Sequence, residues 1–180
     1  MEKETIIEQL EQAHLDLFNF LENQPNELWL QGPEGKWTTG QQALHLLQSI
    51  KALNDALSLP RFFIKYKFGT ANRAVRNYDE VVRRYNQRLS EAKNATFKPS
   101  EAMKIPPLSD KTYLLNRLKM ENKKLQYKTK KLQDKHLDAL ILPHPLMGKM
   151  PVRELLMWTI HHVIHHTNSL KEYYSDLKPN

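Results

Sequence analysis

Apolar side chains recur at helical spacing along four long stretches of the chain, and clusters of proline and glycine separate these stretches. In the first stretch, over 4–22, they form one stripe: Ile6, Leu10, Ala13, Leu17 and Leu21. None of the stretches alternates between apolar and polar positions as a half-buried strand does, so we expect no strand. The pattern predicts an all-α protein.

The starts of the other three long helices are marked in the sequence. Thr38 and Gln41 have the spacing of a capping box, which predicts a helix from there to about residue 57. Ser109 is a candidate cap for a helix that ends near residue 136. Pro151 suits the first turn of the last helix.

The segment 61–107 joins the second and third long helices and has a helical pattern over 79–91. Its length is that of a crossover between antiparallel helix pairs. The sequence therefore predicts one domain, residues 1–180, built as a four-helix bundle whose long crossover carries a short extra helix.

Half of the eight histidines lie within six residues of the last helix. Residues four apart share one face of a helix, so His161/His165 and His162/His166 are the possible pairs. The stripe of the first pair continues to Glu154 and Glu172, whereas apolar residues flank the second pair. We therefore expect His162 and His166 to face inward.

Two buried imidazoles one turn apart need polar partners, and a shared metal ion provides one for both. The alternative is a pair of core histidines that bond to backbone or water. The spacing favours the metal, although such pairs also arise by chance.

The second helix carries His45 off its apolar face, on a stripe with Gln41, Gln48 and Ser49. Small and polar neighbours suggest the wall of a pocket, and these three residues are our candidates for contact with a substrate. The alternative is an exposed histidine, and this helix alone does not decide. His144 is not expected at the same site as His162. It precedes the last helix, and His162 already lies about 16 Å along that helix from Pro151.

Composition narrows the class of protein. There is no cysteine, which removes disulfides and thiolate ligands, and no apolar run is long enough to span a bilayer. The N-terminus lacks the layout of a signal peptide, so we expect a cytoplasmic protein.

The formal net charge of +7 is concentrated in residues 111–136, a segment that contains nine lysines and arginines but only two carboxylates. These charges are spread around the helix, so a solvated face is expected rather than a nucleic-acid site.

Two motifs resemble those of the DinB-like superfamily. They are Trp37-Thr-Thr-Gly-Gln-Gln-Ala-Leu-His45-Leu, and His144-Pro-Leu-Met-Gly148 followed by His162-Val-Ile-His165-His166. The resemblance covers nearly the whole chain and implies a four-helix bundle, often a homodimer, that holds a divalent metal ion with His45, His162 and His166. Many relatives have Arg-Gly-Gln after the last ligand, where this chain has Thr167-Asn168-Ser169. No role is carried over from that arginine or glutamine.

Three protein ligands leave an open coordination position, as in catalytic zinc sites, and zinc or nickel suits an all-imidazole set best. The resemblance implies an enzyme that acts on a small molecule, either a hydrolase or a transferase of low-molecular-weight thiols, the thiol being a cosubstrate. The reacting group would be metal-bound water or thiol, and the sequence offers no further catalytic residue. The alternative is a non-catalytic metal- or ligand-binding bundle of the stress response.

Overall fold

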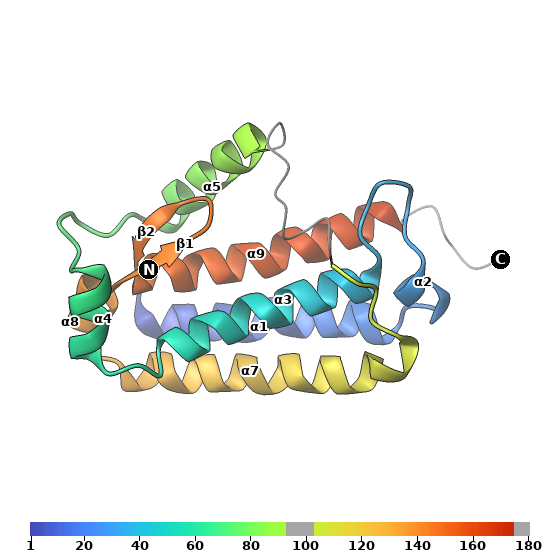
Figure 1. The fold of residues 1–180 in the computed structure, drawn as a ribbon, viewed down its shortest axis with the longest axis horizontal. Coiled ribbons are helices and arrows are strands. Elements are labelled where there is room, and N and C mark those ends of the chain that lie inside the picture. Colours follow the sequence, from blue (N-terminus) through green and yellow to red (C-terminus); the bar gives the residue numbers. More distant parts are fainter. Residues whose placement is uncertain (93–102, 175–180) are drawn as a thin grey trace.

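Four long helices run side by side and form the body of the molecule (Figure 1). The structure is a computed structural model that describes residues 1–92 and 103–174. The four helices are α1 (Lys3–Glu22), α3 (Thr39–Ala56), α7 (Lys111–Lys131) and α9 (Val152–Tyr173). The predicted four-helix bundle is confirmed, and the first helix begins one residue earlier than predicted.

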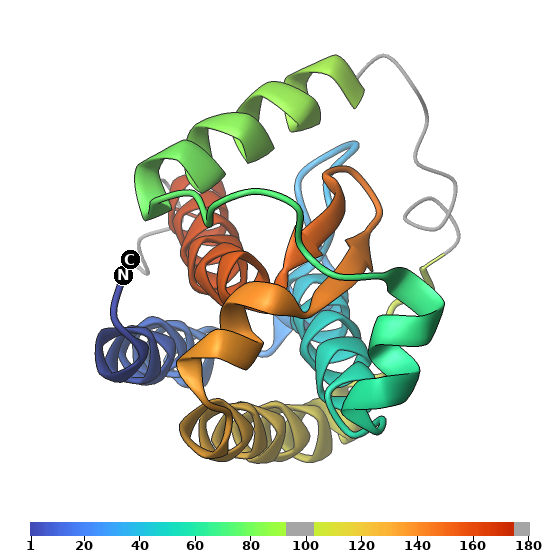
Figure 2. The same cartoon turned by 90° about the vertical axis from the view of Figure 1, so that its left-hand side faces the viewer.

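Seen along its length, the bundle is a ring of four helices (Figure 2). Helix α1 packs between α7 and α9, and α3 packs along α7. On the remaining side of the ring α3 and α9 contact each other less extensively. The side chains described below as the candidate site lie on this side.

The stripe predicted for the first helix lies in the apolar core. Its fully buried members are Ile6, Leu10, Leu17 and Leu21. The nearby His14 is also buried, and its Nδ1–H donates to the carbonyl oxygen of Leu10 at 2.7 Å. His14 is therefore a structural residue of the core.

The start of α3 is fixed by the predicted capping box. The Thr38 hydroxyl accepts from the Gln41 backbone N–H at 3.1 Å, and the Gln41 side-chain oxygen accepts from the Thr38 N–H at 3.0 Å. These bonds satisfy two donors that the first turn of a helix leaves free. The expectation for Ser109 was wrong: it lies in a 3-10 turn (Leu108–Asp110), and α7 begins without a side-chain cap.

The crossover contains two helices, α4 (Arg61–Phe68) and α5 (Tyr78–Ala92). The second matches the short helix predicted over 79–91, whereas α4 was not predicted. Residues 93–102 of the predicted crossover lie outside the described residues. Two further short helices are α2 (Glu27–Leu30) and α8 (Asp134–Ala139). The third long helix was expected to end near residue 136, but α7 ends at Lys131 and α8 follows it as a separate helix.

The expectation of no strand was wrong. Strands β1 (Ile141–His144) and β2 (Gly148–Pro151) pair as an antiparallel hairpin, with His144 opposite Gly148 at the turn. Gly148 has a φ of 71°, a left-handed conformation that costs glycine little. The hairpin folds back against α9 (Figure 1).

A buried carboxylate joins the crossover to α9. Glu154 is fully buried and accepts two hydrogen bonds from the Arg73 guanidinium, at 2.5 and 2.8 Å, and one from the Arg76 backbone N–H at 2.7 Å. Burial raises the pKa of the Glu154 carboxyl, but the bonds from the two arginines outweigh it and hold this pKa below its ordinary value.

Within 1–92 and 103–174, none of the helices has the length and apolarity needed to cross a bilayer.

Candidate metal centre

Three imidazoles from two helices converge at one point. His45 comes from α3, and His162 and His166 come from α9. The Nε2 atom of His162 lies 3.1 Å from Nε2 of His45 and 3.1 Å from Nε2 of His166. One nitrogen from each ring fits within a span of 4.8 Å. The structure thus brings together the three histidines named from the sequence.

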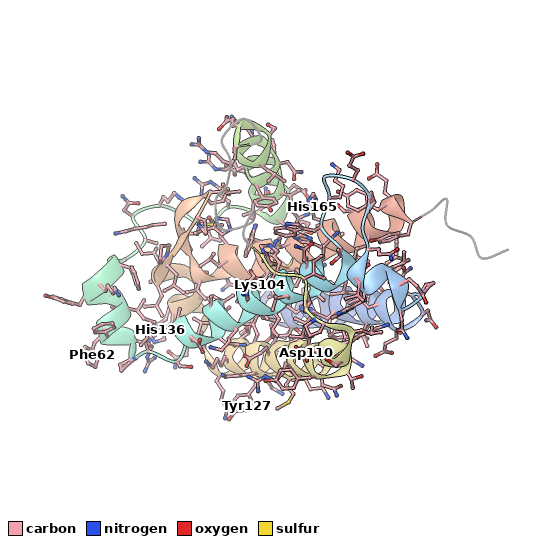
Figure 3. The ribbon with its side chains drawn as sticks, turned by 45° about the vertical axis from the view of Figure 1, so that its right-hand side comes forward. Phe62, Lys104, Asp110, Tyr127, His136 and His165 are labelled. Carbon is pink, nitrogen blue, oxygen red and sulfur yellow. The ribbon has the colours of Figure 1, made fainter. Side chains whose placement is uncertain are left out.

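The orientation of α9 explains why this pair, rather than its neighbour, meets His45. His161 and His165 lie toward α5 (His165 is labelled in Figure 3): Nε2 of His161 is 3.3 Å from the side-chain oxygen of Asn86, and the two rings are 5.8 and 6.4 Å from that of Tyr85. The ring of His162 is also 6.4 Å from Tyr85, but its Nε2 points to His45. The reason given from the sequence was partly wrong, however. Glu154 was placed on a wetter face, but it is buried under the crossover by its two arginines.

The chemistry of the three rings fits a divalent metal ion. Burial lowers the pKa of His45 to about 4, and burial together with the neighbouring rings keeps the pKa values of His162 and His166 well below the ordinary value. All three rings are therefore neutral at physiological pH, which is the ligand form of imidazole. A neutral ring has one N–H and one lone pair, so the central Nε2 cannot satisfy both neighbours by hydrogen bonding. A metal ion accepts all three lone pairs.

Gln42 orients one of the rings. The Nδ1 atom of His166 lies 2.9 Å from the side-chain oxygen of Gln42, which is itself buried. Because this oxygen only accepts, Nδ1 carries the hydrogen and Nε2 keeps its lone pair toward the other histidines. The sequence reasoning missed Gln42; the available signal was a glutamine beside Ala43 on the apolar face of α3.

Two indole rings flank the imidazoles. Trp158 stacks on His162 with ring centroids 4.4 Å apart, and Trp37 lies 4.9 Å from His45. Trp158 is nine-tenths buried. These indole rings cover part of the His162 and His45 rings.

A cavity of about 500 Å³ opens beside the histidines. His45 and His162 form part of its wall, together with Gln48 and Ser49, two of the residues expected to contact a substrate. Gln41 was also expected there, but it is not among the lining residues. Its side chain is engaged in the capping box and donates to the carbonyl oxygen of Met103 at 2.6 Å.

His144 is not one of the converging histidines, as expected, but its distance from them was overestimated, because it lines the same cavity. The distance estimated along α9 did not allow for a hairpin that folds back over the helix. The ring of His144 lies 4.3 Å from Trp158, and its Nδ1 accepts from the backbone N–H groups of Leu146 and Met147, both at 3.1 Å. His144 is not a member of the convergent group, so it shapes the cavity wall rather than adding a fourth ligand.

Known proteins share this architecture. A model of the DinB superfamily matches residues 9–170. Among solved structures, YfiT from Bacillus subtilis, described as a probable metal-dependent hydrolase with an unusual four-helix bundle topology, superposes with a TM-score of 0.61 at 19% identity. The match covers 98% of this chain and 87% of that chain and shows a shared fold. A comparison with curated proteins gave no match.

Proposed function

The chain belongs to the DinB superfamily, and we propose that it is a metal-dependent hydrolase of small molecules whose single divalent ion is held by His45, His162 and His166. The observation that carries the proposal is the convergence of three neutral Nε2 atoms on one point. The description of YfiT as a probable metal-dependent hydrolase supports the reaction type.

Zinc or nickel is the metal we propose, since all three donors are imidazole nitrogens. Such an ion supplies a Lewis acid that polarises a carbonyl group and lowers the pKa of water. Three neutral ligands leave its charge uncompensated, which favours this role.

The residues around the histidines position the substrate and exclude water. The cavity reaches His45 and His162 directly, so a substrate within it lies beside the proposed metal ligands. Hydrolysis adds water across an ester or amide bond: the hydroxyl joins the acyl carbon, and the proton goes to the leaving oxygen or nitrogen. An open cavity at the ligands supports an enzyme over a bundle that only stores or binds metal.

Transfer of a low-molecular-weight thiol is a second candidate. The same three neutral ligands favour it, because an ion that they hold would ionise a thiol as well as water. The homodimer is a further proposal, drawn from the family resemblance.

Two alanine variants test the metal ligands. Protein purified without a histidine tag should contain one metal ion per chain, His162→Ala should lose it, and the matched control His161→Ala, one position away and facing α5, should retain it. Loss in the control with retention in His162→Ala would show that the wrong pair was chosen.

The reaction needs a separate test on the metal-loaded protein. Small neutral esters and amides should be hydrolysed, and His45→Ala should abolish this activity. Turnover of thiols with electrophilic acceptors, but not of esters or amides, would select the second candidate. Activity unchanged in His45→Ala would contradict both.

A further inference from the structure

The cavity beside the histidines follows α3. From His45 its wall passes along one face of the helix to Ser49, Ala52 and Ala56. Ala56 lies eleven positions after His45 in the sequence, which corresponds to about 16 Å along the helix axis. Leu59 and Phe68 line the cavity beyond that point. The cavity is therefore elongated, with the histidines at one end.

Small side chains account for the space. Ser49, Ala52 and Ala56 recur at helical spacing on the side of α3 where α9 approaches less closely. Ala52 is exposed, so its methyl group borders open space rather than packed core. Larger residues at these positions would fill the cavity.

Apart from three histidines, Gln48 and Ser49, the lining of the cavity is largely apolar. Opposite α3, the hairpin contributes Leu142, Pro143 and Leu146, and α9 contributes Leu155. Among the described residues that line the cavity there is no Lys, Arg, Asp or Glu, although the chain carries a formal net charge of +7. A charged group bound along this wall would lose hydration without gaining an ion-pair partner among the lining side chains, which is costly.

We propose that this cavity binds uncharged molecules with an extended apolar body, and that the reacting polar group of the substrate lies at the His45–His162 end. A volume of about 500 Å³ is within the range of small-molecule sites. The orientation of the ligand rests on the proposed function, whereas its chemical class rests on the lining alone. Thiols that carry carboxylates do not fit this class.

A chain-length series tests the ligand class. Straight-chain primary amides from butyramide to octanamide are titrated into metal-free protein while the fluorescence of Trp158 and Trp37, which line the cavity, is recorded. Affinity should rise about fourfold for each added methylene, because each methylene becomes buried. Octanoate should bind the metal-free protein at least roughly tenfold more weakly than octanamide, since its carboxylate finds no partner among the lining side chains. A flat series, or equal affinity for octanoate, would overturn the proposal.

A matched pair of variants locates the binding. Ala52→Phe fills the cavity and should weaken octanamide binding at least roughly tenfold. Lys51→Phe adds the same ring one position away, at an exposed site outside the lining, and should leave affinity unchanged. Equal effects in the two variants, with helix content preserved in both, would contradict the assignment to this cavity.

The His166→Ala variant separates this inference from the proposed function. Chain-length dependence that persists in this variant supports the apolar site even if the wild-type protein holds no metal. A wild-type protein that binds one metal ion but gives a flat series after the metal is removed would leave the proposed function standing and overturn the inference.

Discussion

Single side chains decide the chemistry of the candidate site. The spacing of the histidines in the last helix was readable from the sequence, because residues four apart share a helix face. The residue that accepts the hydrogen bond from His166 was not readable from the sequence. This residue, Gln42, lies 124 positions away, and a pattern within one helix cannot show which residue of another helix lies opposite. The place of His144 at the cavity wall was missed for the same reason, since the hairpin brings it there.

The contact between Gln42 and His166 gives a prediction about metal affinity. Gln42→Leu removes the acceptor that holds the His166 ring with its Nε2 lone pair toward the other two histidines. Metal affinity should fall by about 10–100-fold, as for other residues that orient a ligand. The measurement is competition with a chelator of known affinity. Gln48→Leu, the same change on the same helix at an exposed position, serves as the control and should bind metal as the wild type does.

At the level of elements, helices were predictable and the hairpin was not. The helix predicted over 79–91 is found at Tyr78–Ala92. It could be predicted because a long amphipathic stretch shows the helical period in its sequence. Each strand has four residues and includes a proline, so neither shows an alternating pattern. Their pairing also depends on packing against α9, which the local sequence does not contain.

The attachment of the crossover to α9 depends on Glu154. Glu154→Gln removes a buried negative charge, so Arg73 loses its carboxylate partner and Arg76 keeps only its pair with Glu80. Breaking a fully buried pair costs about 3–5 kcal/mol, and because both arginines are partly exposed we expect about 2–3 kcal/mol of lost stability by chemical unfolding. The control is Glu80→Gln, whose carboxylate is 41% exposed in its pair with Arg76 and should cost less than about 1 kcal/mol.

The pH dependence of this difference gives a second readout for the same pair of variants. The folded pKa of Glu154 lies below its ordinary value of 4.5. The stabilisation is therefore complete above about pH 4.5 and is lost as the pH falls through the lower, folded pKa. A difference between wild type and Glu154→Gln that grows as the medium becomes more acidic would contradict the assignment.

Across the whole molecule, the charge excess of the third long helix and the candidate site occupy different parts of the bundle. Several cations of α7 contact carboxylates of the protein: Lys119 pairs with Glu22, and Arg117 and Lys124 pair with Glu121. These contacts support the proposal that α7 is a solvated face rather than a nucleic-acid site. The cavity, by contrast, has an uncharged lining and lies on the side formed by α3 and α9. Net charge alone would therefore mislead about the ligand.

The last prediction is that the metal serves a reaction and does not hold the bundle together. Leu10 and Leu17 of α1 and Leu118 and Leu125 of α7 are fully buried in the apolar core, whereas the three histidines come from α3 and α9. This core remains when the metal is removed, and a site with three protein ligands is open where structural zinc sites are normally closed.

Protein treated with a chelator should therefore keep its helical circular dichroism at room temperature. Metal should raise the melting temperature only through binding, by about 2.7 kcal/mol of added stability at a concentration 100 times its dissociation constant. His162→Ala is the control, because chelator and metal should both leave its melting temperature unchanged. Loss of the helical signal from wild-type protein on chelation would mean that the site is structural, and the reading of an open catalytic centre would fail.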